Sequence, residues 1–310
     1  MKPSVSSKII SPLLLLIAAI VWGFAFSAQK EASSTPPLTL GAMRSILAAV
    51  FLGAVILITG AVKKKRGISS KKTNKFTKEE LISGIVCGVV LALTNLFQQL
   101  GLMGGTSTSK ASFIIALYVI LVPIYELFLG KLPHLKAIIS LLISVPGFYF
   151  LCSVDSFALS LSDIFIIGST LVFPIYILTL DKYANEIDPF KMSFIQFTVA
   201  AAVSLIPAVI FELPLNLEVI YSDLPYIVIL GIGSSGIAYT LQAIGQRGVN
   251  PTVSALILSL ESVFGAIGAA LFLSESMGRN EYIGAILIFL AVIISQIEFK
   301  EKKEKPKTEG

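Results

Sequence analysis

The residue of this chain with the clearest chemical potential is Glu261, which stands inside an apolar run at residues 250–273. It lies about eleven residues into that run, so a helix would place it ~16 Å deep, near the centre of a bilayer with ~30 Å of hydrocarbon. An ionisable side chain at this depth is costly and by default marks a pathway for substrate or protons. The alternative is a neutral carboxyl group that bonds a neighbouring helix and serves only structure.

Seven further residues combine polar or aromatic side chains with positions inside apolar runs, and together with Glu261 they form the predicted substrate site. They are Trp22, Asn95, Gln98, Tyr118, Tyr176, Tyr239 and Gln242. Aromatic walls with a few amide groups suit a small amphipathic solute, such as an amino acid or an aromatic metabolite. Each ring could equally serve ordinary helix packing, whereas an amide deep in a span needs a partner on another helix or a wet cavity. We expect Gln98 and Gln242 to face one central cavity from opposite sides.

Two other charged residues lie within apolar runs. Arg44 stands in the outer third of the run at 38–62, where it could anchor a helix at the membrane interface or contact the substrate. Glu126 lies five residues before Lys131, and we expect its side chain to extend to the inner surface.

A catalytic centre is not predicted. The single histidine, His134, lies in a short loop between apolar runs. Cys87 and Cys152 lie within apolar runs, which indicates packing rather than a disulfide, a metal site or a nucleophile. The sequence contains no Gly-rich phosphate cradle and no Cys/His spacing typical of metal sites. We therefore expect no catalytic residue, no metal and no cofactor, with an intramembrane enzyme or a non-transporting membrane partner as alternatives.

These residues must be positioned by membrane helices. Hydrophobic residues make up 55% of the chain and charged residues 14%, and the mean hydropathy is +0.86; soluble proteins carry about 25% charged residues. A span within lipid must be helical, because every backbone polar group has to be satisfied within its own segment. Ten apolar runs fall near residues 10–30, 38–62, 81–103, 106–130, 134–152, 162–181, 189–211, 224–246, 250–273 and 281–299. A signal peptide around Leu13–Ile20 is an alternative for the first run, which is longer than the usual apolar region of such peptides.

The basic residues are distributed unevenly between the two sides of these runs. If the N-terminus is cytoplasmic and the runs alternate in direction, 20 of the 24 lysines and arginines fall inside and 4 outside. Positive charge concentrates on the cytoplasmic side of membrane proteins, so both termini are predicted to be cytoplasmic. This distribution also explains the net charge of +5 without nucleic acid as a partner. The expected partners are the lipid bilayer and a small-molecule substrate; a coupling proton and the oligomeric state are left open.

The two halves of the chain resemble each other. Residues 101–131 align without a gap on residues 245–275, with 8 of 31 positions identical, and the same offset of 144 pairs Gln98 with Gln242. Earlier runs align at an offset of 152, which pairs Arg44 with Gln196, and the basic loop 63–80 accounts for the change in offset. Five spans per half are an odd number, so the second copy must insert upside down, as in transporters with inverted repeats.

This arrangement predicts an all-α integral membrane protein of ten transmembrane helices. The first five-span repeat occupies residues 10–152 and includes the basic loop 63–80, which we expect to be cytoplasmic and flexible. The second repeat occupies residues 162–299, and residues 300–310 form a charged tail whose composition predicts disorder.

Several motifs resemble one known family. They are AAIVWGFAFSAQK in the first run, FQQLGL and FIIALYVILVP around the fourth, SFIQF in the seventh, and NPTVSALILSLESVF followed by LFLSE in the ninth. Over roughly residues 10–298 the chain resembles the drug/metabolite transporter superfamily, in its EamA branch of ten-span permeases. The resemblance implies a carrier for small molecules.

The sequence therefore predicts a secondary transporter in the cytoplasmic membrane that moves small metabolites, in the export direction, by alternating access. A facilitative uptake permease of the same fold is the alternative. No nucleotide-binding site is encoded, so transport is expected to be secondary or facilitated. If protons drive it, Glu261 should alternate between a neutral state in a dry environment and a charged state in a wetter one.

Overall fold

The computed structural model describes residues 5–66, 75–132, 135–151, 160–274 and 278–296. Throughout these ranges the chain is helical, apart from short connections, and forms no strand. The predicted tail 300–310, Ser70 in the centre of the basic loop, and His134 and Cys152 all lie outside the described residues.

The first half contains α1 (Val5–Glu31), the short η1 (Ala32–Ser34), α2 (Pro37–Lys65), α3 (Lys78–Met103), α4 (Thr108–Ala116), α5 (Tyr118–Phe128) and α6 (Leu135–Leu151). The second half contains α7 (Leu161–Tyr183), α8 (Pro189–Phe211), α9 (Leu217–Val228), the π-helical segment η3 (Ile229–Ala238), α10 (Tyr239–Gly245), α11 (Pro251–Leu258), α12 (Glu261–Phe272) and α13 (Arg279–Gln296). Each of the ten predicted apolar runs coincides with one of these helices or with a chain of consecutive ones.

Eight helical stretches within the described residues are long and apolar enough to cross a bilayer, and two shorter apolar helices lie in α6 and α13. The protein is therefore a multi-pass membrane protein. The helix ends differ in detail from the expected runs: α2 extends beyond residue 62 through Lys63–Lys65, and α9 begins at Leu217, seven residues before the run expected at 224–246.

The ends of several helices follow from local sequence. A capping box begins α3, with Thr77 accepting from the Glu80 amide and Glu80 accepting from the Thr77 amide. The same arrangement begins α7 at Ser160 and Asp163, and the Asn250 side chain caps α11. These side chains satisfy amide groups that the first helical turn leaves without a partner.

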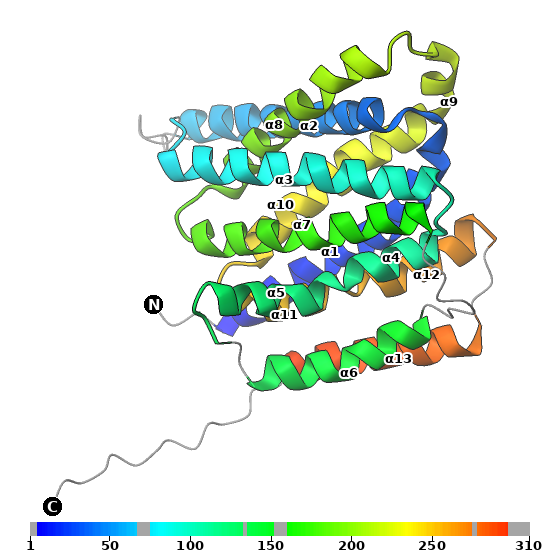
Figure 1. The fold of residues 1–310 in the computed structure, drawn as a ribbon. Coiled ribbons are helices and arrows are strands. Elements are labelled where there is room, and N and C mark those ends of the chain that lie inside the picture. Colours follow the sequence, from blue (N-terminus) through cyan, green and yellow to red (C-terminus); the bar gives the residue numbers. More distant parts are fainter. Residues whose placement is uncertain (1–4, 67–74, 133–134, 152–159, 275–277, 297–310) are drawn as a thin grey trace, which may run out of the picture.

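Helices from the two halves interdigitate (Figure 1). Helix α1 packs against α12 and the η3–α10 region, and α7 packs against α4, α5 and α3. Helices α2 and α3 both contact α8, whereas α6 and α13 form a pair at one flank of the bundle. The largest fully buried side chains are Tyr118 of α5, Tyr176 of α7, Phe148 of α6 and Phe197 of α8, and all four belong to one hydrophobic core.

Three of the long helical stretches are irregular near their centres. The α4–α5 stretch breaks at Leu117, whose amide donates to the Ile114 carbonyl, and α11–α12 breaks at Ser259 and Leu260 with the same short-range pattern. The Ser259 and Ser262 hydroxyls donate to backbone carbonyls one turn earlier at the second break. In the third stretch, η3 connects α9 to α10. Irregular backbone at membrane depth is tolerated where it is buried in protein or borders a cavity.

Candidate functional site

A small cavity lies at the centre of the bundle, and residues of all three irregular stretches line it. Its volume is about 40 Å³. Its lining comes from α1, α2, α3, α4, α7, η3, α10 and α12, and comprises Trp22, Ala25, Phe26, Gln29, Arg44, Thr94, Asn95, Gln98, Ile115, Phe173, Ser234, Tyr239 and Glu261. Both halves of the chain therefore build its walls.

Five of the eight predicted site residues line this cavity, namely Trp22, Asn95, Gln98, Tyr239 and Glu261. Tyr118 and Tyr176 do not; both are fully buried behind the wall and pack against the cavity residue Phe173. Gln242 also lies away from it, with its amide donating to Gln246 on the same stretch of chain at 3.4 Å. The structure thus brings Gln98 to the cavity but not Gln242, in contrast to the expectation that both face it.

An aromatic cluster forms one wall of the cavity. The ring of Trp22 lies 4.6 Å from that of Tyr239 and 6.1 Å from that of Phe173, measured between centroids. Tyr239 in turn meets Tyr176 edge-on at 5.6 Å. Each such pair contributes about 1 kcal/mol beyond the area that it buries. The Trp22 indole also donates to the backbone carbonyl of Ser234, so this wall is fixed to η3.

Arg44 is the residue that the sequence left between two interpretations, and the structure places it in the cavity wall, 4% exposed. Its Nε donates to the Ser235 hydroxyl at 3.1 Å and a terminal nitrogen donates to the Ser234 hydroxyl at 3.2 Å. Within the described ranges it forms no ion pair. The repeat alignment pairs Arg44 with Gln196, so both halves carry a polar residue at this position of an apolar run. In the structure Gln196 is buried as well.

Glu261 is the first residue of α12 and is 4% exposed. Its carboxyl group lies near the Tyr118 hydroxyl, yet its Oε1 makes no hydrogen bond of standard geometry in the described part of the chain. A buried polar atom without a partner is costly. The cavity therefore contains one carboxyl group and one guanidinium group that are not bonded to each other.

Amide and hydroxyl groups complete the polar part of the lining. The Gln98 amide donates to the Gln29 side chain at 3.3 Å, which joins α3 to α1. The hydroxyl of Thr94, one position before Asn95, makes no hydrogen bond to a described residue. These groups can donate and accept several hydrogen bonds to a polar ligand.

The size of the cavity limits what it can hold. A volume of about 40 Å³ has room for roughly three water molecules, whereas sites for organic ligands span about 300–1,000 Å³. At this volume the cavity cannot hold a metabolite, which could bind there only if the surrounding helices separated.

The position of Glu126 contradicts the expectation that its side chain extends to the inner surface. Its side chain is 3% exposed and does not extend to the surface; instead, Thr252 donates its hydroxyl proton to Glu126 Oε2, which ties α5 to α11. Nearby, Lys131 forms an ion pair with Asp181 at 3.3 Å. A separate pocket of about 410 Å³ borders both contacts. The flexible glutamate side chain could have reached water, but in the structure it places its carboxylate against the start of α11.

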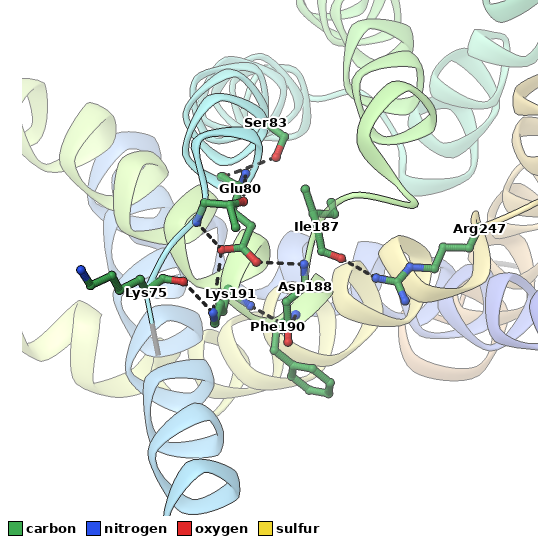
Figure 2. A network of polar contacts seen from close by, with 9 residues as sticks. Lys75, Glu80, Ser83, Ile187, Asp188, Phe190, Lys191 and Arg247 are labelled. Atoms are coloured by element: carbon green, nitrogen blue, oxygen red, sulfur yellow. Dashed lines mark hydrogen bonds and ion pairs between the residues drawn. The ribbon is translucent and has the colours of Figure 1, made fainter. Parts of the chain in front are cut away.

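A second polar network lies at the same end of the bundle (Figure 2). Glu80 accepts a hydrogen bond from the Asp188 amide at 3.1 Å and lies 4.0 Å from the Lys191 ammonium group. Arg247 donates to the Ile187 carbonyl at 2.6 Å. These contacts join the start of α3 to the start of α8 and to the segment after α10, so this end, hereafter the basic end, is closed by bonds between the two halves.

The end of the bundle that carries the α1–α2 and α8–α9 connections, hereafter the opposite end, is also tied. Glu212 accepts from the Leu38 and Thr39 amides at the start of α2, at 2.9 and 2.7 Å. Asp223 accepts from the Thr35 amide and hydroxyl. Carboxylates at helix N-termini are stabilised by the free amides there.

Comparison with known sequences finds relatives of one kind. The model of the EamA-like transporter family matches residues 9–153 and 160–296. An uncharacterized transporter of Archaeoglobus fulgidus is 29% identical over 93% of this chain and 86% of its own length. An uncharacterized transporter of Methanothermobacter thermautotrophicus is 25% identical over 90% of this chain and 84% of its own length.

Comparison with solved structures shows the same architecture. One crystal structure superposes with a TM-score of 0.69, covering 92% of this chain and 96% of that chain, at 18% sequence identity. At this identity the likeness concerns the fold alone.

Proposed function

The chain belongs to the EamA-like transporter family, and from this premise we propose that it is a secondary transporter of small metabolites that works by alternating access. The observation that carries the proposal is the small cavity at the meeting point of both halves, whose lining combines polar and aromatic side chains. It holds Arg44, Glu261 and several amides at a depth where such groups are otherwise costly. Amino acids and other amphipathic or aromatic compounds are the proposed substrates, and export is the proposed direction.

Helix packing supports the proposal of two inverted five-helix repeats, at residues 10–152 and 162–299. Helix α1 contacts α12, and its counterpart α7 contacts α4 and α5, which are the counterparts of the α11–α12 stretch. The α2–α8 and α6–α13 contacts each join two equivalent helices. Exchange of the two halves therefore maps the α1–α12 contact onto the contacts of α7 with α4 and α5, and maps the α2–α8 and α6–α13 contacts onto themselves. An inverted pair of repeats provides two related conformations that open to opposite sides of a membrane.

Ten crossings with both termini in the cytoplasm are proposed from the distribution of basic residues, with the basic end facing inward. A cysteine introduced at Ser70, in a background with Cys87 and Cys152 replaced by serine, should react with an impermeant thiol reagent only after the membrane is opened. Labelling in intact cells would contradict the orientation.

A flux measurement tests the transport function. Purified protein in sealed proteoliposomes, preloaded with unlabelled amino acids or amphipathic acids, should exchange a radiolabelled substrate with saturable kinetics. Gln98→Leu removes an amide from the cavity wall, so it should weaken transport while the protein still folds. Liposomes without protein and the Ala54→Leu variant, at an exposed position on α2, are the controls.

The alternatives separate in the same experiment. A facilitative uptake permease would show exchange but no accumulation against a gradient. Absence of exchange for every solute, with the protein folded and monodisperse, would favour a non-transporting membrane protein. Conversion of a solute rather than its movement would indicate an intramembrane enzyme.

A further inference from the structure

An apolar groove of about 500 Å³ runs beside the central cavity. It lies between α1, the α9–η3 junction and the end of α12, and its walls include Phe24, Tyr226, Ile229 and Phe272. Ile229 and Phe272 are more than half exposed, so the groove opens at the side of the bundle. Its volume falls in the range of organic ligand sites, unlike that of the cavity.

The groove and the cavity meet. Ala25 and Ser234 line both spaces, so the cavity and the groove adjoin at these two residues. Ser234 also holds Arg44 through its hydroxyl and Trp22 through its carbonyl. A ligand that places its polar group at Arg44 can therefore extend an apolar chain past Ala25 when the cavity widens.

The charge of the Arg44 guanidinium indicates which polar group of a ligand would bind there. The guanidinium is bonded to two neutral hydroxyls and to no carboxylate within the described residues, and a planar guanidinium matches a carboxylate or phosphate in geometry. Glu31 also lines the groove, and a carboxylate there disfavours an anionic group of the ligand. The cavity also contains the Glu261 carboxyl group, which would repel an anion if it were charged. With Glu261 in its neutral state, the arrangement favours an anionic head at Arg44 and an apolar tail in the groove.

We propose that the cavity and the groove form one two-part site for an acidic amphiphile, that is, a small organic acid with an apolar tail. The head binds the Arg44 guanidinium, held in place by the η3 serines, and the tail passes Ala25 into the groove. This inference rests on the proposed transport function and names the chemistry of its substrate. A phospholipid tail that merely fills the groove is the competing occupant.

The chain offers an internal reporter for the test. Trp22 lines the cavity and is the only tryptophan in the sequence, so its fluorescence reports binding at the head position. Purified protein in detergent is titrated with straight-chain carboxylates of increasing length and with alkylammonium ions of matched length. The carboxylates should bind with a Kd that falls about fourfold per added methylene until the groove is filled. Equal or tighter binding of the alkylammonium ions would overturn the assignment of charge.

Two brominated probes test the orientation, because bromine quenches tryptophan on contact. 2-Bromooctanoate should quench Trp22 more strongly than 8-bromooctanoate at equal occupancy. The reverse order would place the tail in the cavity and overturn the two-part site.

Two variants test the two subsites separately. Arg44→Gln should weaken carboxylates of every length by at least tenfold. Ala25→Leu fills the passage to the groove, so it should remove the dependence on chain length, whereas the matched Ala54→Leu control should retain it. A chain-length dependence that survives in Ala25→Leu overturns the groove assignment.

The lipid alternative and the transport function are tested apart from one another. If chain-length dependence seen in detergent disappears in phosphatidylcholine nanodiscs, lipid occupies the groove and the proposal fails. Binding as predicted without flux in proteoliposomes would contradict the transport function but leave the site assignment standing. Exchange of other solutes without carboxylate binding would overturn the inference alone.

Discussion

The two broken helical stretches, α4–α5 and α11–α12, share their geometry but differ in chemistry. The repeat alignment pairs Leu117, at the first break, with Glu261, at the second. Helix α5 ends in the Glu126–Thr252 contact and, just beyond it, the Lys131–Asp181 pair. Helix α12 instead ends at Phe272 beside the apolar groove.

The difference shows that two equivalent helical stretches of similar geometry can take different roles. The α4–α5 stretch is closed by bonds at the basic end and carries an aliphatic side chain at its break. The α11–α12 stretch carries an ionisable group at its break, and within the described residues no polar contact joins Phe272–Ser274 to another helix. We therefore infer that α5 acts as a latch and that α12 carries the group whose charge can change.

The largest expected effect comes from the carboxyl group at the second break. Glu261→Gln retains shape and hydrogen bonding but removes the ability to change charge. If transport is coupled to protons, gradient-driven accumulation and its pH dependence should be lost, while exchange across the membrane persists. Flux in proteoliposomes across a range of pH measures both properties.

The matched control for this substitution is Leu117→Met at the other break, which should leave the pH profile unchanged. A Glu261→Gln protein with the pH profile of the parent would assign the residue a structural role.

The second effect concerns how α12 is held. A Cβ atom at Gly23 of α1 would lie 2.3 Å from the Phe264 Cβ and 2.8 Å from the Gly265 amide nitrogen, so the two helices meet through a residue without a side chain. Gly23→Val should force them apart and destabilise the protein by about 3 kcal/mol. Thermal unfolding in detergent measures the loss.

Gly60→Val on α2 is the matched control, because no atom lies within 4 Å of a Cβ at that position. Equal destabilisation by the two substitutions would show that helix propensity rather than the contact between α1 and α12 is responsible.

A smaller effect is expected at the latch of α5. Thr252→Val removes the hydroxyl that donates to the buried Glu126, and an unpartnered buried acceptor costs about 1–3 kcal/mol. The free energy of unfolding should fall by that amount, with opening at the basic end measured as faster labelling of a cysteine at Asn185, which borders the same pocket.

Thr59→Val provides the comparison, since the Thr59 hydroxyl is exposed and bonds only its own helix. Unchanged labelling in Thr252→Val would argue against a latch.

The smallest effect is expected for the exposed ion pair. The Lys131 side chain is 54% exposed and that of Asp181 is 24% exposed, so solvent screens their attraction. Lys131→Ala should cost less than about 1 kcal/mol, and the cost should fall further at high salt. A double-mutant cycle with Asp181→Ala measures the coupling; a value above that of the Glu126–Thr252 contact would reverse the order proposed here.

The sequence alone determined the helices and several of the polar residues that line the cavity. Each apolar run predicted a helical stretch that is found within the described residues, because backbone groups in lipid have no other way to be satisfied. Asn95, Gln98 and Glu261 were identifiable because buried polar groups are expensive and therefore mark a special environment. The repeat was visible because both copies retain glycine and Leu-Phe-Leu positions at one offset.

Only the tertiary structure decided which side chains meet. Trp22 and Tyr239 line the cavity, whereas Tyr118 and Tyr176 pack behind it, although all four have similar sequence surroundings. A helix that is apolar on every face carries no pattern that fixes its rotation, so contacts with neighbouring helices set it. For the same reason, Arg44 turned inward to the η3 serines and Glu126 turned to Thr252: each partner lies more than 100 residues away in the sequence, and only folding brings it within bonding distance.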